Sequence, residues 1–390
     1  MTEHNKQISF PSFLKSALDK RKEQQAFRSL KINYPTVDFS SNDYLGFSTQ
    51  GILYNEIKKL DSSIKMGSTG SRLISGNSSV YQELEHTIAT FHQSESALVF
   101  NSGYDANIGL LSSVPQKGDL ILSDELIHAS LIDGIRLSYA THYKFKHNSI
   151  EALEALLVRH KEAFNEIYIV VESVYSMDGD CAPLKEYITL CKKYNAHIIV
   201  DEAHAIGVFG AQGKGLCNEL QIESDCFARI YTYGKAMGCH GASVVGSSIL
   251  KDFLINFSRS FIYTTAMPEH SVLAIKAAYQ LLQNTTQITT LKNNIAYFNS
   301  KIVASGSFIE SISSIHCKIV SGNQEVQTLE DTCWKNNLFV KSIKSPTVKV
   351  TQERIRICLH AFNTQQEIDL LLSFLGSSTF LVDPIAIGLS

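Results

Sequence analysis

Polar side chains that could do chemistry follow several short apolar runs of this chain. Glu172 comes directly after one run, Asp201 and His204 come at the end of the next, and Lys235 lies close behind a third. If these runs are parallel strands, their carboxyl ends meet at one edge of a sheet, where ligands of such sheets bind. Carboxylate, imidazole and amine groups gathered there could hold a charged cofactor and transfer protons.

Six candidate strands can position these groups. They are rich in β-branched residues, and helix-length segments such as 149–159 and 183–194 lie between them. This alternation predicts an α/β fold with a mostly parallel, doubly wound sheet and a smaller C-terminal α+β domain. We expect an N-terminal arm at residues 1–45, a large domain at 46–280 and a small domain at 281–390. The candidate strands are 97–100, 119–122, 166–171, 197–200, 229–232 and 242–245.

Asp201 and Lys235 form the most informative pair. They are 34 residues apart, about one strand–helix–strand repeat, so both can lie at neighbouring strand ends. A lysine there can form a Schiff base with an aldehyde such as pyridoxal phosphate (PLP), whose ring nitrogen needs an anion and whose phosphate needs a cradle. Gly103, before a predicted helix, and Thr232 could form that cradle. Taken singly, Lys235 is more often a solvated lysine and Gly103 a turn glycine.

The acidic pair Asp201–Glu202 also allows a nucleotide-binding interpretation, because such a pair can hold magnesium. An ATPase of that kind needs the pattern G-x-x-x-x-G-K-[ST] upstream of the pair. The two Gly-Lys pairs of this chain, at 213–214 and 234–235, lie downstream and lack the following hydroxyl residue. We therefore do not expect an ATPase.

The composition limits other classes of function. With 390 residues, 44% hydrophobic and 19% charged, the chain is typical of a globular protein, and its net charge of −3 gives no basic excess for a nucleic acid. No apolar stretch approaches the ~18 residues that a membrane span needs, and the first residues, MTEHNKQISF, lack a signal-peptide layout. The eight cysteines form no C-x-x-C pair, which favours reduced thiols over a metal site. We expect a cytoplasmic protein with no metal, no nucleic acid and no membrane span.

Longer motifs give the chain a family resemblance that covers nearly its whole length. The motifs are 39–46 (FSSNDYLG), 67–76 (GSTGSRLISG), 101–107 (NSGYDAN), 123–130 (SDELIHAS), 176–180 (SMDGD), 201–204 (DEAH), 232–235 (TYGK) and 354–357 (RIRI). In order and spacing they resemble the α-oxoamine synthases. These are PLP-dependent transferases of the aspartate aminotransferase-like fold (fold type I) that condense an amino acid with an acyl-CoA and release carbon dioxide.

The resemblance implies roles around PLP. Lys235 resembles the lysine that binds the cofactor covalently and moves protons at the substrate α-carbon. Asp201 resembles the partner of the pyridinium nitrogen, and His128 resembles the histidine stacked on the ring. His204 resembles a hydrogen-bond donor to the phenolic oxygen, together with Ser176. Lys235, Asp201, His128 and His204 are the candidate catalytic residues.

Two segments resemble the phosphate contacts of this family. One follows the first candidate strand, and the other, at 261–268, belongs in this family to the neighbouring subunit. The resemblance therefore implies a homodimer with a shared active site. The candidate phosphate-binding residues are Ser102, Gly103, Tyr104, Thr232, Thr264 and Thr265.

The resemblance also implies substrate contacts. Arg356 matches the arginine that binds the amino-acid carboxylate, a task that suits the planar guanidinium. Asn42 and Arg28 match positions near the substrate carboxylate and the acyl chain. Arg354, two residues before Arg356, is expected to point the other way on its strand, toward solvent or an acidic partner. The segment 358–363 (CLHAFN) departs from many relatives, which leaves the choice of acyl chain open.

Within the family, the chain most resembles the branch that joins L-alanine to pimeloyl-CoA, or to its carrier-protein thioester. That reaction gives 8-amino-7-oxononanoate, CoA and CO2 in biotin synthesis. Two sibling reactions stay open: serine with a long acyl-CoA, as in serine palmitoyltransferase, and glycine with acetyl-CoA, as in glycine C-acetyltransferase. A non-catalytic scaffold of the PLP fold is a remote alternative, against which the intact Lys235, Asp201 and His204 argue.

Overall fold

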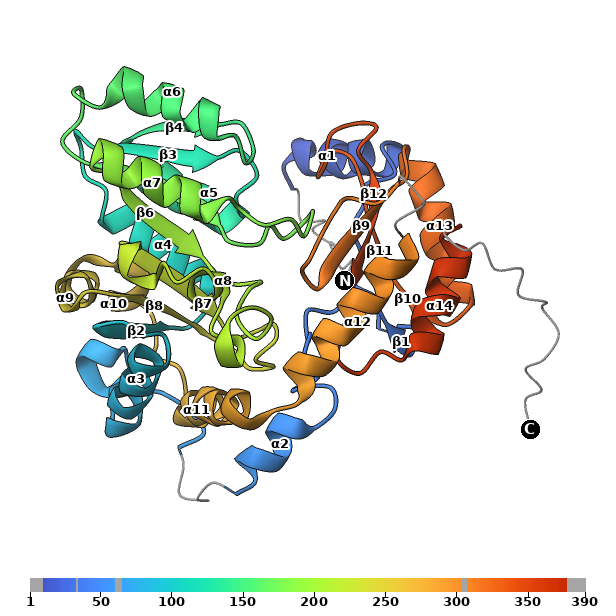
Figure 1. Cartoon of the computed structure of the whole chain (residues 1–390), viewed down its shortest axis with the longest axis horizontal. Helices are drawn as coiled ribbons and strands as arrows, with labels where there is room; N and C mark the ends of the chain where they lie inside the picture. The colour runs from blue at the N-terminus through green and yellow to red at the C-terminus, as the bar shows by residue number, and fades with distance from the viewer. Residues whose placement is uncertain (1–9, 33, 60–64, 303–306, 377–390) are drawn as a thin grey trace, which may run out of the picture.

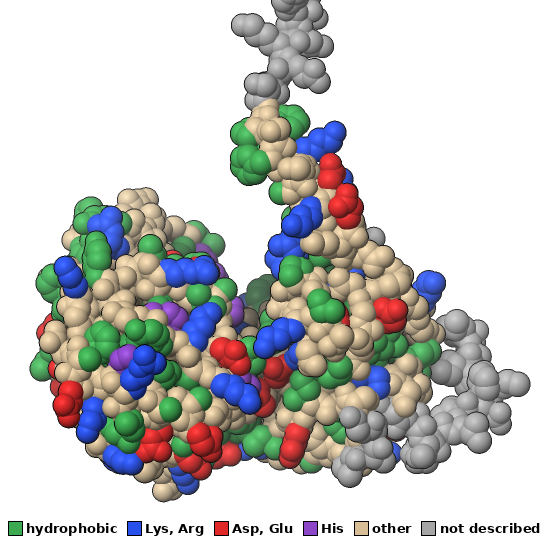
Figure 2. Space-filling model, turned by 90° about the horizontal axis from the view of Figure 1, so that it is seen from above, with side chains coloured by type: hydrophobic (Ala, Val, Ile, Leu, Met, Phe, Trp, Pro, Cys, Tyr) green, Lys and Arg blue, Asp and Glu red, His purple; other side chains and the backbone are tan. Residues whose placement is uncertain are grey.

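The computed structural model describes residues 10–32, 34–59, 65–302 and 307–376 (Figure 1). These residues form two lobes, each built on its own sheet. One lobe holds a seven-stranded sheet and the other a three-stranded antiparallel sheet. Figure 2 shows a groove between the two lobes. Among the helices described, none has the length and apolar character that crossing a membrane requires.

The seven-stranded sheet has the strand order β2–β8–β7–β6–β5–β3–β4. β8 runs antiparallel to both of its neighbours, β2 and β7, while β7, β6, β5, β3 and β4 are parallel to one another. This confirms the predicted α/β class with a mostly parallel sheet. The strands are β2 (Ser96–Phe100), β3 (Leu120–Asp124), β4 (Thr141–Phe145), β5 (Ile167–Glu172), β6 (His197–Asp201), β7 (Ala228–Thr232) and β8 (Ala242–Gly246).

All six candidate strands are present, and the sequence missed β4. The central strand β5 is buried at every position, as expected for a parallel strand that is covered on both faces. By contrast, β4 lies at the sheet edge with the sequence THYKF, of which only Phe145 is buried. An edge strand of this kind has no apolar run to reveal it.

Helices connect these strands. Ser149 caps α6 by accepting a hydrogen bond from the backbone N–H of Ala152, and Asn195 ends α7 in a left-handed conformation. α4 packs against α5, and α3 packs against β2 and α11. The longer helices of this lobe are α3 (Ser79–Phe91), α4 (Gly103–Ser113), α5 (Ala129–Leu137), α6 (Ile150–His160), α7 (Leu184–Tyr194), α9 (Ser248–Phe257) and α11 (Glu269–Asn284). Shorter elements are α2 (Ile52–Ile57), α8 (Leu216–Glu219), α10 (Arg259–Ile262), a π-helix (Arg72–Gly76) and 3-10 turns (Ala211–Gly213, Glu223–Asp225).

The second lobe combines the C-terminal residues with a strand from near the N-terminus. β1 (Val37–Asp38) pairs in parallel with β10 (Leu338–Phe339), and the backbone N–H of Cys358 donates to the carbonyl of Phe39. The motif 39–46 is thereby held against the C-terminal lobe. The other elements are β9 (Ile315–Ile319), β11 (Lys341–Ile343), β12 (Arg354–Cys358), α12 (Gln287–Ile302), α13 (Asn323–Lys335) and α14 (Gln365–Phe374). The division at residues 45 and 280 stays a prediction.

Helix α1 (Ser12–Glu23) extends away from both sheets and buries none of its residues. Figure 2 shows this part of the chain projecting from the lobe that holds the three-stranded sheet. Hydrophobic side chains on it, such as Phe13 and Leu18, are exposed. The apolar side of this helix has no partner among the described residues.

Candidate active site

A cavity of about 270 Å³ lies beyond the carboxyl ends of the parallel strands. Ala203 and Gly234, which follow β6 and β7, form part of its wall. The site therefore lies where the rule for open parallel sheets places it. The candidate residues that line this cavity are Asn42, Ser102, Gly103, Tyr104, His128, Asp201, Thr232 and Lys235.

Lys235 joins a hydrogen-bonded chain that leads into the second lobe. Its Nζ lies 2.7 Å from Nε2 of His204, and Nδ1 of His204 lies 2.7 Å from the hydroxyl of Tyr44. Tyr44 also donates to Oδ1 of Asn42 at 3.1 Å. Burial lowers the pKa of Lys235 to about 8, against the opposing charges of Asp201 and then Glu172. Burial, followed by the charge of Lys235, also lowers the pKa of His204, so this imidazole is neutral at physiological pH.

Asp201 ends β6 and is held on both oxygens. Oδ1 accepts from the backbone N–H of Ala203 at 3.0 Å, and Oδ2 accepts from Nδ2 of Asn107 at 2.9 Å. Asn107 lies on α4 and donates from the same nitrogen to Oγ of Ser130. Asp201 is 4% exposed, so this carboxylate is fixed rather than free to follow solvent. Asn107 was not predicted, although it is a polar residue on the same helix face as Gly103, one turn away.

The N-terminus of α4 forms one end of the cavity. Ser102 caps this helix by accepting from the backbone N–H of Asp105 at 3.1 Å, and Gly103 is its first residue. A Cβ at Gly103 would lie 2.5 Å from Cγ2 of Thr232, so the first residue of α4 and the end of β7 can approach this closely only because residue 103 is glycine. The hydroxyl of Thr232 is buried and has no hydrogen-bond partner among the described residues. Tyr104 donates its hydroxyl to Asp133 at 2.5 Å.

His128 and Glu172 complete the cavity wall. His128 caps α5, and its Nδ1 lies 2.7 Å from Oγ of Ser130. Partial burial lowers the pKa of His128, and the charge of Asp201 opposes this. Glu172 ends β5 and is 2% exposed, and burial, followed by the charge of Asp201, raises its pKa to about 8. Glu172 is therefore protonated near neutral pH.

Arg356 comes from β12 of the second lobe and is held by three acceptors. Nε donates to the carbonyl of Ser176 at 2.8 Å, Nη2 to Oδ1 of Asn42 at 3.0 Å and Nη1 to Sγ of Cys358 at 2.9 Å. Asn42 lines the cavity, so Arg356 lies directly behind the cavity wall. Cys358 belongs to the unusual segment 358–363, and the contact places that segment next to Arg356.

The expected direction of Arg354 was wrong in part. Residues two apart on a strand share a face, so Arg354 points the same way as Arg356. Its guanidinium forms an ion pair with Asp178, and its side chain is 7% exposed. The prediction that Arg354 pairs with an acidic residue is confirmed, but the prediction that it points away from the face of Arg356 was wrong.

Other predicted residues lie outside the cavity wall. The guanidinium of Arg28 is exposed and contacts the hydroxyl of Thr347 at 3.4 Å. Ser176 contributes its backbone carbonyl, rather than its hydroxyl, to the contact with Arg356. Oγ1 of Thr264 and the carbonyl of Thr265 accept hydrogen bonds from Asn101 of the same chain. The proposed roles of these four residues stay predictions.

The residues of the cavity fit PLP on the chemistry of their donors. Thr232 offers an unpartnered buried hydroxyl, and the first amides of α4 favour an anion beside it. Asp201 offers a fixed carboxylate for a ring nitrogen, and Lys235 offers an amine for an aldehyde. Anion-binding and cation-binding groups thus occupy the same cavity, as a molecule with a phosphate and a pyridinium requires.

Comparisons with known proteins agree with this fit. The description "Aminotransferase class I and II" matches residues 34–375. The 8-amino-7-oxononanoate synthase of Emericella nidulans is 41% identical over 389 residues, which cover 93% of this chain and 94% of that protein. Serine palmitoyltransferase of Sphingomonas wittichii superposes with a TM-score of 0.86 at 27% identity and covers 95% of this chain and 98% of its own. The 8-amino-7-oxononanoate synthase of Francisella tularensis superposes with a TM-score of 0.71 at 29% identity and covers 87% and 96%. Matching structures of serine palmitoyltransferase were solved with PLP.

Proposed function

The chain belongs to the aminotransferase class I and II family, and we propose that it is a PLP-dependent acyltransferase that joins L-alanine to pimeloyl-CoA. The products are 8-amino-7-oxononanoate, CoA and CO2, as expected of an enzyme of biotin synthesis. The family membership confirms the resemblance read from the sequence. The observation that carries the proposal is the single cavity that presents Lys235, Asp201, the α4 N-terminus and the unpartnered Thr232 together.

PLP, when bound, supplies an electron sink for a carbanion at the amino-acid α-carbon. Asp201 would pair with the ring nitrogen, and its hydrogen bonds from Asn107 and Ala203 fix the carboxylate for that role. Removing one partner of a buried ion pair typically costs ~3–5 kcal/mol, so Asp201 is the least replaceable charge after Lys235. Gly103 and Thr232 would hold the phosphate, and His128 would lie against the ring.

Lys235 carries the proton transfers at the α-carbon. With its pKa lowered to about 8 by burial, a large fraction of the amine is neutral near pH 8, and a neutral amine can take a proton. His204, which is neutral and 2.7 Å from Lys235, keeps the amine in place through its bond to Tyr44. Lys235 takes the α-proton of alanine and later returns a proton to the same carbon.

Arg356 binds the carboxylate of the amino acid. Ser176, Cys358, Asn42 and Tyr44 engage up to four of its five N–H groups, so at least one N–H is left for a carboxylate. We also propose a homodimer in which Thr264 or Thr265 of one subunit reaches the phosphate of the other. We also propose that Arg28 lies near the acyl chain of the substrate. Assays with pimeloyl-CoA and with the carrier-protein thioester decide which acyl donor the enzyme uses.

Serine palmitoyltransferase activity is the second candidate, because the TM-score to that enzyme, 0.86, exceeds the 0.71 to the 8-amino-7-oxononanoate synthase structure. The sequence comparison favours the first candidate, since the identity to an 8-amino-7-oxononanoate synthase is 41% against 27%. A shared fold by itself does not identify the reaction, so the TM-score does not decide between the two candidates. Alanine with pimeloyl-CoA is therefore the first choice.

A substrate matrix tests the proposal. Alanine, serine and glycine are each paired with pimeloyl-CoA, acetyl-CoA and palmitoyl-CoA, and free CoA thiol and CO2 are measured. Alanine with pimeloyl-CoA should give the highest kcat/KM, and Lys235→Ala should abolish turnover and the cofactor absorbance. Preference for serine with palmitoyl-CoA would assign the second candidate. Turnover that persists in Lys235→Ala would refute the mechanism.

A further inference from the structure

The loop of residues 176–181, here called the bridging loop, is the middle part of the connection from β5 to α7 and contacts the second lobe. Four consecutive residues each make a polar contact with β9, β12 or the segment before β9. The contacts are Ser176 carbonyl with Arg356 Nε (2.8 Å), Met177 carbonyl with Cys317 Sγ (2.8 Å), Asp178 with the guanidinium of Arg354, and Gly179 carbonyl with the hydroxyls of Ser311 (2.9 Å) and Ser313 (2.8 Å).

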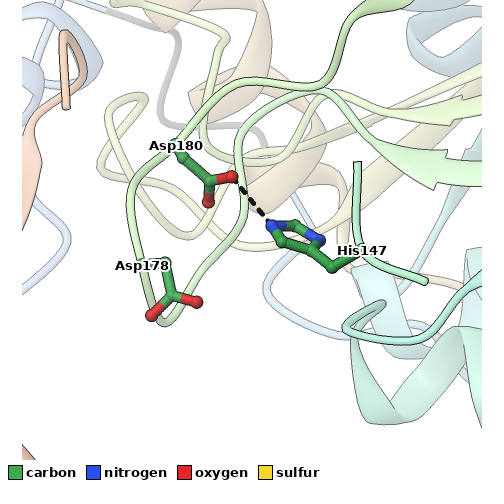
Figure 3. A group of neighbouring side chains, drawn as sticks. All are labelled: His147, Asp178 and Asp180. Carbon is green, nitrogen blue, oxygen red and sulfur yellow. Dashed lines mark hydrogen bonds and ion pairs between the residues drawn. The ribbon is translucent and has the colours of Figure 1, made fainter. Parts of the chain in front are cut away.

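The next residue, Asp180, faces the first lobe instead. Its Oδ2 accepts from Nε2 of His147 at 2.8 Å and from Nδ2 of Asn148 at 2.7 Å. Figure 3 shows His147 pointing at Asp180, with Asp178 farther along the same loop. The other ring nitrogen of His147, Nδ1, lies 3.0 Å from Asp124, which ends β3 and is fully buried. His147 thus links the large sheet to the bridging loop.

The geometry requires a charged imidazole. Both ring nitrogens face carboxylate oxygens, which only accept hydrogen bonds, and an imidazole donates from both nitrogens only when it is protonated. Burial alone would lower the pKa of His147, but the hydrogen bonds to Asp124 and Asp180 outweigh it and raise the pKa to about 9. Near neutral pH, His147 is therefore a cation between two carboxylates.

The same three side chains do not make a convincing metal site. Ligand atoms of His147, Asp178 and Asp180 lie within 4.8 Å of one another, a spacing that a cation could bridge. However, Nε2 of His147 already donates to Asp180, and Asp178 is paired with Arg354. Asp178 and Asp180 each already have a cationic partner, so the chemistry of this group points to a structural link.

We propose that His147 is a positioning residue that fixes the bridging loop through Asp180 and thereby holds Arg356 in place for the amino-acid carboxylate. The inference rests on the proposed function only for the identity of that carboxylate. Arg356 depends on the loop because Ser176 accepts from its Nε. The loop in turn is held to the β4–α6 connection by His147 and Asn148, and of these two only His147 carries a charge and continues to Asp124 of β3.

Other groups near His147 also bear on its charge. The Tyr175 ring packs edge-on at 4.5 Å, and the backbone N–H of His147 donates to Glu125 at 3.3 Å. Burial raises the pKa of Tyr175, and that of Tyr187 rises for the same reason, with the charges of Asp124 and Asp180 adding to it. Both phenols therefore stay neutral over the pH range in which His147 loses its proton.

The test compares wild-type holoenzyme with His147→Gln, which can still donate a hydrogen bond but cannot carry charge. Alanine is titrated in the absence of thioester, and its Kd is read from the cofactor absorbance. We expect the Kd for alanine to be about tenfold higher in the variant at pH 7.5, with kcat within threefold and the Kd for PLP unchanged. The tenfold ratio should close as the pH rises through about 9, because the wild type then loses the same charge.

His197→Gln is the matched control, since Nε2 of His197 also pairs with a carboxylate, that of Glu166, at 2.9 Å. His197 begins β6, whereas Asp201 of the cavity ends it. This variant should behave as wild type at every pH. A ratio that stays constant across the pH range, or an equal loss of PLP affinity, would overturn the positioning role, because either result means general destabilisation.

Hydrogen exchange of the holoenzyme gives a readout that needs no substrate. Peptides covering 172–184 and 354–358 should exchange faster in His147→Gln than in wild type, while peptides of β7 and β8 should not change. Unchanged exchange in both segments would refute the inference whatever the substrate is. If wild-type protein binds none of the three amino acids, the proposed function fails, and faster exchange still supports the link between His147 and Arg356.

Discussion

Replacing Gly103 by alanine should weaken PLP binding through one identifiable contact. The new Cβ would lie 2.5 Å from Cγ2 of Thr232. The two carbons must separate by about 0.9 Å to reach the 3.4 Å at which ordinary contact begins. Either Thr232 rotates, which moves its unpartnered hydroxyl away from the cavity, or the N-terminus of α4 shifts. Both responses displace a group that we assign to the phosphate.

A misplacement of about 1 Å can lower a reaction rate about a hundredfold, which corresponds to about 2.7 kcal/mol. We apply the same scale to the binding of the PLP phosphate. We therefore expect the Kd for PLP to rise by between tenfold and a hundredfold in Gly103→Ala. The next nearest atom to the new Cβ is Cβ of Thr232, at 3.5 Å, which is an ordinary contact. Thr232→Ser removes Cγ2 and keeps the hydroxyl, so the double variant should bind PLP within about threefold of Thr232→Ser alone.

The assay is a titration of cofactor-free protein with PLP, followed by absorbance, together with urea unfolding of each unloaded variant. Gly67→Ala serves as the control, because a Cβ at Gly67 meets no atom within 4 Å. Wild-type affinity in Gly103→Ala would show that the close approach to Thr232 does not shape the phosphate site. If the double variant stays as weak as Gly103→Ala, the methyl clash is not the cause.

Three further predictions test other parts of the site. The rate at which Lys235 captures PLP should rise about tenfold per pH unit below pH 8 and level off above it, since only the neutral amine reacts. In Asp201→Asn this levelling-off should occur at lower pH, because loss of the Asp201 anion destabilises the Lys235 ammonium. Asn107→Ala should lower the unfolding free energy of the unloaded protein by about 1–3 kcal/mol in urea titrations, because it leaves a buried oxygen of Asp201 without its donor. Arg356→Lys should raise the KM for alanine at least tenfold in steady-state assays, because lysine cannot form the planar fork, whereas Cys358→Ser, which retains an acceptor for Arg356, should change it less than threefold.

The sequence predicted the parts of the site that follow buried strands. Glu172, Asp201 and Thr232 end strands β5, β6 and β7, and these strands are visible as apolar runs because both of their faces are covered. Once the runs are parallel, the residues at their carboxyl ends must meet. The presence of Lys235 and Asp201 in one cavity could therefore be predicted without knowing any contact between residues far apart in the sequence.

The residues that the sequence missed are those whose partners are far away in the chain. Tyr44 reaches His204 across 160 residues, and Asn107 reaches Asp201 across 94. Their local sequence shows only a tyrosine and an asparagine, and nothing in its spacing specifies the partner. Arg354 was misplaced for a different reason, because the period of two on a strand was not applied to a pair two residues apart.

The charges of the cavity also determine which way a bound PLP can lie. Burial raises the pKa of Glu172 to about 8, so this side chain is uncharged near neutral pH and does not compete with the Asp201 carboxylate for a cation. The cavity wall also holds the α4 N-terminus, whose amides favour an anion. A phosphate placed beside Asp201 would face a carboxylate, and a ring nitrogen placed at α4 would face N–H donors. Asp201 would therefore take the ring nitrogen and the α4 N-terminus the phosphate, while Lys235 in the same cavity would supply the amine for the aldehyde.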